Sequence, residues 1–142
     1  MVNSIRRIII ERQKAKTFEK VFQKYQQFSM IPKQSYIDTL KIVKKYYKGG
    51  DIVECGVWKG GMIAGIADIL GDNGTYYLFD SFEGLPTAKE IDGDAALLWQ
   101  SSKNSNNYYD NCKATEEEAI EVMRLSNVKN FITIKGWFED TL

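Results

Sequence analysis

A glycine-rich turn with an acidic residue in front of it is the first feature that could do chemistry. Glu54 lies near the end of an apolar stretch and is followed by Gly56, Gly60 and Gly61. Glycines remove side chains from such a turn, so a ligand can approach the backbone and the start of the next helix. The spacing E-x-G-x-x-x-G-G differs from the G-x-G-x-x-G of dinucleotide enzymes. A carboxylate here suits a cofactor that carries a cation or hydroxyl groups, and a purely structural tight turn is the alternative.

A second acidic residue, Asp80, ends the next apolar stretch, with Ser81 beside it. Nucleotide-binding folds place an acidic side chain there, about 20 residues past the glycine turn, to accept hydrogen bonds from ribose hydroxyls. The alternative for a lone aspartate at a strand end is capping of the local turn. Because Asp80 follows a glycine turn at the right offset, the pattern favours the ribose role.

A third apolar stretch leads into Gly136 and Trp137. An aromatic ring beside accessible main chain suits an adenine base, through stacking and backbone hydrogen bonds. Core packing of Trp137 is the alternative. The carboxyl ends of parallel strands meet at one edge of a sheet, so the three segments together predict a single nucleoside site.

Three blocks of the sequence together resemble the macrocin O-methyltransferase (TylF-type) family. They are residues 54–61 (ECGVWKGG), 80–86 (DSFEGLP) and 136–142 (GWFEDTL), and the resemblance runs from about residue 49 to the end. It implies a Rossmann-like class I methyltransferase that uses S-adenosyl-L-methionine and, in characterised members, Mg²⁺. It also implies a small-molecule hydroxyl acceptor, on a sugar or a glycosylated natural product.

The resemblance also implies roles for particular residues. The cofactor-binding set comprises Glu54, Gly56, Gly60 and Gly61 around the methionine moiety, Asp80 and Ser81 at the ribose, and Gly136 and Trp137 near the adenine. It names no catalytic residue and no metal ligand here, because family members carry the magnesium ligands and the general base in later strands. Asp92 and Asp94 are the nearest comparable pair, and we interpret them as a polar turn or a substrate-facing lid, with a metal site as the weaker alternative.

The elements that must position these residues form an α/β pattern. Residues 51–55, 75–79 and 131–134 read as strands, while residues 61–70 and 115–126 read as helices between them. Right-handed crossovers make the strands parallel, and the resemblance implies that their order is 3-2-1. The resemblance makes this the N-terminal half of the fold with its C-terminal strands absent, so we expect the first strand to form an open edge.

Two predicted helices precede the sheet. An aromatic stripe within residues 18–28 and a second stripe within residues 32–47 repeat at helical spacing, and Gly49-Gly50 ends the second helix. Residues 1–48 carry twelve Lys/Arg and three Asp/Glu (+9), whereas residues 49–142 carry seven and sixteen (−9). We therefore divide the chain into a basic helical segment, 1–48, and an incomplete cofactor-binding domain, 49–142. The basic face suits solvent, a phosphate-bearing partner or an acidic surface.

A long polar stretch, residues 84–114, separates the second strand from the next helix. A short helix is predicted within it, around residues 95–100. Loops of this length inside a compact domain are usually functional or mobile.

Composition excludes several classes of function. The 142 residues include no histidine and two cysteines, which rules out histidine-based triads and four-thiolate zinc sites. Nineteen basic and nineteen acidic side chains cancel, so we expect no nucleic-acid partner. No apolar run is long enough for a membrane span. We expect a cytoplasmic homo-oligomer that acts as an O-methyltransferase, with a non-catalytic cofactor-binding module as the alternative and a nicotinamide oxidoreductase as the weakest hypothesis.

Overall fold

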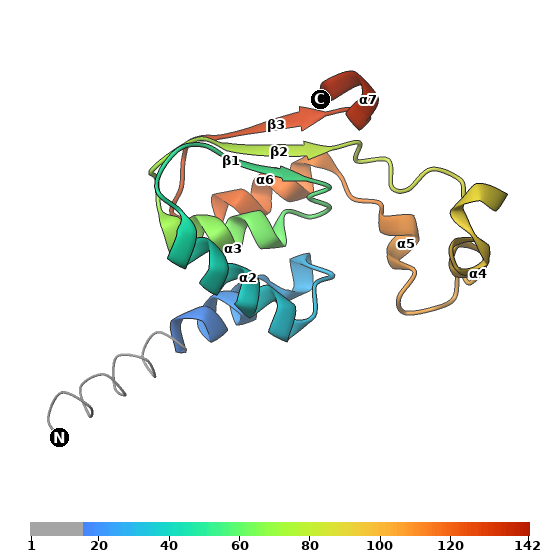
Figure 1. The fold of residues 1–142 in the computed structure, drawn as a ribbon, viewed down its shortest axis with the longest axis horizontal. Coiled ribbons are helices and arrows are strands. Elements are labelled where there is room, and N and C mark those ends of the chain that lie inside the picture. The colour runs from blue at the N-terminus through green and yellow to red at the C-terminus, as the bar shows by residue number, and fades with distance from the viewer. Residues whose placement is uncertain (1–15) are drawn as a thin grey trace, which may run out of the picture.

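The computed structural model describes residues 16–142 (Figure 1). The first part of the predicted basic segment, residues 1–15, lies outside the described residues. Residues 16–25 are helical, and the 3₁₀ turn η1 (Gln26–Phe28) and helix α2 (Lys33–Tyr46) follow. Both predicted N-terminal helices are therefore present, and Pro32 is the N-cap of α2.

Three parallel strands form one sheet, which lies along one side of the packed helices (Figure 1). They are β1 (Ile52–Cys55), β2 (Tyr76–Asp80) and β3 (Phe131–Lys135), and their order is β1-β2-β3. The register pairs Cys55 with Phe79, and Asp80 with Lys135. This confirms the predicted three-stranded order, and it brings the carboxyl ends of all three strands to the same edge.

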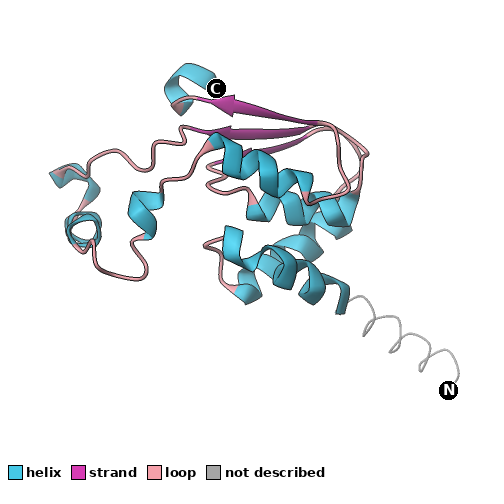
Figure 2. Ribbon diagram, turned by 180° about the vertical axis from the view of Figure 1, so that it is seen from behind, coloured by secondary structure: helices cyan, strands magenta, loops and turns pink. Residues whose placement is uncertain are grey.

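Helices connect the strands and pack together on one side of the sheet. Helix α3 (Gly61–Leu70) links β1 to β2, and α6 (Glu116–Arg124) leads into β3. Thr115 caps α6 through a capping box with Glu118, as its T-E-E-E sequence predicts. Helices α2, α3 and α6 lie on the same side of the strands in both views (Figure 2).

One hydrophobic core joins the helices and the sheet. Fully buried large side chains come from the N-terminal segment, α2, α3, the sheet and α6: Tyr25, Tyr36, Leu40, Ile63, Tyr76, Leu78 and Met123. The helices before residue 49 therefore share their core with the part that contains the sheet. No helix of the described residues is long and apolar enough to cross a membrane.

Within residues 16–142, no helix covers the opposite side of the sheet, which is apolar (Figure 2). Strand residues alternate between the two faces, so Val53 and Ile132 point away from α3 and α6, and they are 56% and 47% exposed. Tyr77 and Phe79 of the central strand belong to this face by the same alternation.

Residues 84–114 form a projecting arm beyond the carboxyl ends of the strands (Figure 1). The arm contains η2 (Glu90–Asp92), α4 (Asp94–Ser101) and the short turn α5 (Tyr109–Cys112). The predicted short helix is thus present as α4. The last element of the chain is α7 (Phe138–Thr141).

Candidate functional site

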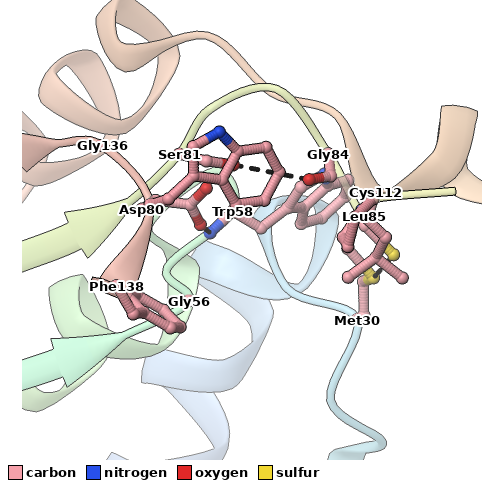
Figure 3. Close-up of a pocket in the computed structure, with 12 residues that line it drawn as sticks. Met30, Gly56, Trp58, Asp80, Ser81, Gly84, Leu85, Cys112, Gly136 and Phe138 are labelled. Atoms are coloured by element: carbon pink, nitrogen blue, oxygen red, sulfur yellow. Dashed lines mark hydrogen bonds between the residues drawn. The ribbon is translucent and has the colours of Figure 1, made fainter. Parts of the chain in front are cut away.

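A cavity of about 460 Å³ opens at the carboxyl ends of the three strands. It is lined by residues from the loop before α2, the turns after all three strands, and the two ends of the arm: Met30, Gly56, Trp58, Asp80, Ser81, Gly84, Leu85, Pro86, Cys112, Gly136, Trp137 and Phe138. Five of these residues belong to the set predicted from the sequence. In Figure 3, Met30, Leu85 and Cys112 lie together at one end, while Gly136 and Phe138 lie toward the other.

Asp80 holds two strained turns with its carboxylate. Its Oδ2 accepts a hydrogen bond from the backbone N–H of Trp58 at 2.8 Å, and its Oδ1 accepts one from Phe82 at 2.8 Å. Trp58 and Phe82 both have left-handed backbones, with φ of 50° and 57°. The turn-capping role considered for Asp80 is therefore present. Each carboxylate oxygen keeps a further lone pair for a hydroxyl donor in the cavity.

Glu54 lies in a smaller recess of about 140 Å³ next to the main cavity. Met30, Gly56 and Trp58 line both spaces, so the two adjoin. The Glu54 carboxylate accepts a hydrogen bond from the backbone N–H of Ile63, but its buried Oε2 has no hydrogen-bond partner. Burial, with a smaller contribution from the nearby Asp80 charge, raises the pKa of Glu54 to about 8. A buried, unpaired carboxylate of this kind suits a cationic ligand group.

The predicted glycines divide into two groups. Gly56 has φ of 81°, and a side chain there would point into open space beside the cavity. Gly60 packs on the backbone of Ala119, and a Cβ at Gly61 would come within 2.4 Å of the carbonyl oxygen of Phe28. Gly60 and Gly61 therefore serve close packing of α3, and neither lines the two spaces described here. Their contact with a cofactor stays a prediction.

The turn after β3 contains Gly136 and Trp137, the residues of the third predicted segment. Gly136 donates its backbone N–H to the carbonyl oxygen of Asp80 at 3.0 Å, which ties this turn to the end of β2. Trp137 is 37% exposed and lines the cavity together with Phe138, which is 44% exposed. Trp137 is thus only partly packed, and two aromatic side chains are present where an adenine base was expected.

Ser81 is buried in the wall of the cavity. Its hydroxyl oxygen accepts a hydrogen bond from the backbone N–H of Glu83 at 3.2 Å, and the hydroxyl donates to the Gly84 carbonyl at 3.4 Å. Ser81 therefore shapes the turn after β2 at the point where the arm begins.

Met30 and Cys112 line the cavity although sequence reasoning did not identify them. The Sγ of Cys112 lies 3.8 Å from the Sδ of Met30 and joins the loop before α2 to the end of the arm. Neither side chain has an obvious chemical signature, and they are far apart in sequence. No pattern in the sequence could have paired them.

The described residues contain no candidate metal site. Within residues 16–142, no group of three or more acidic or cysteine side chains is arranged to hold an ion. Asp92 accepts the backbone N–H of Lys89 at 2.7 Å, and Asp94 begins α4. Both aspartates therefore have positions typical of a polar turn and a helix start.

Comparison with protein families decides the classification. The model of the macrocin-O-methyltransferase (TylF) family matches residues 14–142. The chain belongs to this family. The match includes the helices before residue 49, so the TylF-family region contains the N-terminal segment that lines part of the cavity.

A search of solved structures shows the same fold. The chain is similar to the O-methyltransferase NovP with a TM-score of 0.55 and 24% sequence identity, over 80% of this chain and 49% of the NovP chain. This TylF-family chain thus spans about half the length of NovP. The search of curated protein sequences found no match.

Proposed function

We propose that this chain forms the S-adenosyl-L-methionine pocket of an O-methyltransferase. The observation that carries the proposal is the pair of carboxylates at the ends of neighbouring strands, one buried with an unpaired oxygen and one lining the cavity. Glu54 would bind the cofactor's ammonium group, and Asp80 would accept hydrogen bonds from the ribose hydroxyls. Gly136, Trp137 and Phe138 would surround the adenine.

The residues present fit this cofactor on structural grounds. The unpaired Oε2 of Glu54 offers an acceptor to a cation, and the bare backbone of Gly56 permits close approach beside it. Asp80 is held by two backbone donors, so its carboxylate is oriented before a ligand arrives. A preorganised pocket of this kind lowers the entropic cost of binding.

Membership of the TylF family supports methyl transfer to an oxygen as the chemistry. When bound, S-adenosyl-L-methionine supplies an electrophilic sulfonium methyl group. Glu54 at the ammonium group and Gly136, Trp137 and Phe138 at the adenine would hold the two ends of the cofactor. We propose a hydroxyl of a sugar or glycosylated natural product as the acceptor. We assign no described residue as the general base.

Magnesium does not fit the described residues. An octahedral Mg²⁺ site needs several oxygen ligands, and the acidic side chains near the cavity, Glu54 and Asp80, are committed to the roles above. We therefore derive no step through a metal ion.

Titration calorimetry with S-adenosylhomocysteine tests the proposal. The 142-residue chain is expected to bind the ligand saturably. Asp80→Ala is expected to weaken binding by at least about tenfold, because charge-assisted hydrogen bonds contribute about 1.5–3 kcal/mol each. Asp94→Ala, an exposed aspartate at the start of α4, is the matched control and should bind as the unchanged chain does.

A second variant separates loss of binding from loss of fold. Asp80 also holds Trp58 and Phe82, so Asp80→Ala is checked by circular dichroism and compared with Glu54→Gln, which keeps the side-chain volume. A folded chain that binds no S-adenosylhomocysteine would overturn the proposal. Binding without methyl transfer to any sugar acceptor would favour the non-catalytic module.

A further inference from the structure

Trp58 lies in the turn after β1 and contacts both the end of β2 and the end of the arm. Its backbone N–H donates to Asp80 Oδ2 at 2.8 Å, and its indole N–H donates to the carbonyl oxygen of Lys113 at 3.0 Å. Its ring also packs edge-on against Tyr109, with ring centroids 5.8 Å apart. Trp58 therefore joins the cofactor turn, the ribose-binding aspartate and the last residues of the arm.

The arm segment that Trp58 contacts has an unusual backbone. Four consecutive residues, 109–112, have left-handed conformations, with φ of 49°, 50°, 57° and 59°. Such residues cost free energy and persist only when surrounding contacts fix them. On one side the segment is held by Asn111, which exchanges hydrogen bonds with Leu85 at 2.9 and 2.6 Å. On the other side it is held by Trp58.

The Trp58 ring is itself fixed from the side of α6. Lys59 Nζ lies 5.2 Å from the centroid of the Trp58 ring and 2.9 Å from the carboxylate of Glu118. Glu118 in turn accepts the backbone N–H of Thr115. The indole is therefore held between the Lys59 ammonium group and the arm. A movement of the Trp58 backbone would change the contacts of its ring with Lys113 and Tyr109.

We propose that Trp58 is a positioning residue that couples occupancy of the cofactor pocket to the order of arm residues 109–113. The inference rests on the proposed function, because the ligand acts through Asp80 and the turn at Gly56. A ligand on these groups fixes the strained backbone of Trp58. The fixed indole then stabilises the left-handed segment, whose Cys112 lines the same cavity.

Amide hydrogen exchange of the 142-residue chain, with and without S-adenosylhomocysteine, tests the coupling. The ligand is expected to slow exchange at residues 109–113 in the unchanged chain. Trp58→Phe keeps a ring in place but removes the indole N–H. At a ligand concentration that saturates each chain, this variant is expected to lose that protection. In the ligand-free state its residues 109–113 should exchange about fivefold faster, which corresponds to the loss of one hydrogen bond.

A matched control uses the other indole hydrogen bond of the arm. Trp99 donates its indole N–H to the Asn107 carbonyl at 3.1 Å, within the arm and away from the cavity. Trp99→Phe should loosen the arm locally but leave the ligand-induced protection of residues 109–113 intact. A merely structural role of Trp58 would not reproduce this difference.

Each outcome decides the inference. Equal ligand-induced protection in the unchanged chain and in Trp58→Phe would overturn it. If Trp58→Phe fails to fold, Tyr109→Ala removes the ring contact from the arm side, and undiminished protection in that variant would overturn it as well. A folded chain that does not bind S-adenosylhomocysteine would overturn the proposed function. The coupling would be overturned with it, because no ligand would then occupy the pocket.

Discussion

At the scale of single residues, two carboxylates one strand apart have opposite environments. Asp80 is held by two backbone N–H groups, whereas Glu54 is buried with one oxygen unpaired. Burial without a partner favours the neutral form of a carboxyl group. The pocket therefore contains an acidic group, Glu54, whose ionisation a bound cation would favour.

The pKa of Glu54 predicts a pH-dependent stability. Burial raises this pKa from 4.5 to about 8, so between these values the folded chain keeps a proton that the unfolded chain has lost. The free energy of unfolding should therefore fall as the pH rises from 4.5 to about 8. Glu54→Gln, which cannot ionise, should remove this contribution and be more stable than the unchanged chain at pH 8. Urea unfolding at several pH values measures the difference.

Glu83→Gln is the control for this prediction because Glu83 is exposed at the start of the arm. It should retain the pH dependence of the unchanged chain. A Glu54→Gln variant that loses stability with pH as steeply as the unchanged chain would contradict the assignment. The ligand-bound chain should show a weaker dependence, since a bound ammonium group stabilises the charged carboxylate.

At the scale of elements, close packing places α3 against the N-terminal segment. The phenol of Tyr36 on α2 donates a buried hydrogen bond to the carbonyl oxygen of Gly61 at 2.7 Å. A Cβ on Gly65 would lie 1.9 Å from that phenol oxygen. The glycines of α3 therefore set the distance between the two helices, and with it the position of residues 28–31 at the cavity.

Gly65→Ala is expected to destabilise the fold despite alanine's higher helix propensity. Overpacking of this kind costs about 1–3 kcal/mol, and it outweighs a gain of about 1 kcal/mol from replacing glycine within a helix. Chemical denaturation of the single and double variants measures the effect. The penalty should be smaller in a Tyr36→Phe background, where the clashing oxygen is absent. Equal penalties in both backgrounds would show that Tyr36 is not the contact that excludes alanine.

Local patterns in the sequence predicted most of the helices and strands. Periodicity identified the strands, α2, α3 and α6, and the T-E-E-E sequence identified the start of α6 at Thr115. The carboxyl ends of the strands then followed from the right-handed crossover, which is why Asp80 and Gly136 were correctly expected at one edge.

Local sequence patterns did not predict contacts between residues that are far apart in the sequence. Met30 meets Cys112 because α2 packs on α3 while the arm folds back, and neither residue has a local pattern that signals this contact. The left-handed segment within the arm was likewise not predicted. Asp110 and Asn111 are residue types that tolerate this conformation, but their neighbours Tyr109 and Cys112 gain it only from tertiary contacts.

At the scale of the whole molecule, the parallel sheet is covered on one face only within residues 16–142. Parallel sheets occur almost only with both faces buried. The open face carries apolar side chains on all three strands, including both edge strands, and such surfaces associate with other chains. The open face therefore supports the homo-oligomer expected from the sequence, which remains a proposal.

Self-association through the open face is expected to depend on Val53 and Ile132. They are 56% and 47% exposed on the two edge strands, and a lysine at each position would place charge where two copies would have to exclude water. Sedimentation velocity over a range of concentrations should show association of the unchanged chain and a shift toward monomer for Val53→Lys combined with Ile132→Lys. Ile42→Lys adds the same charge at a 58% exposed position on α2, away from this face, and should leave association unchanged. A chain that stays monomeric at every concentration, or an equal effect of Ile42→Lys, would show that the open face does not bind a second copy.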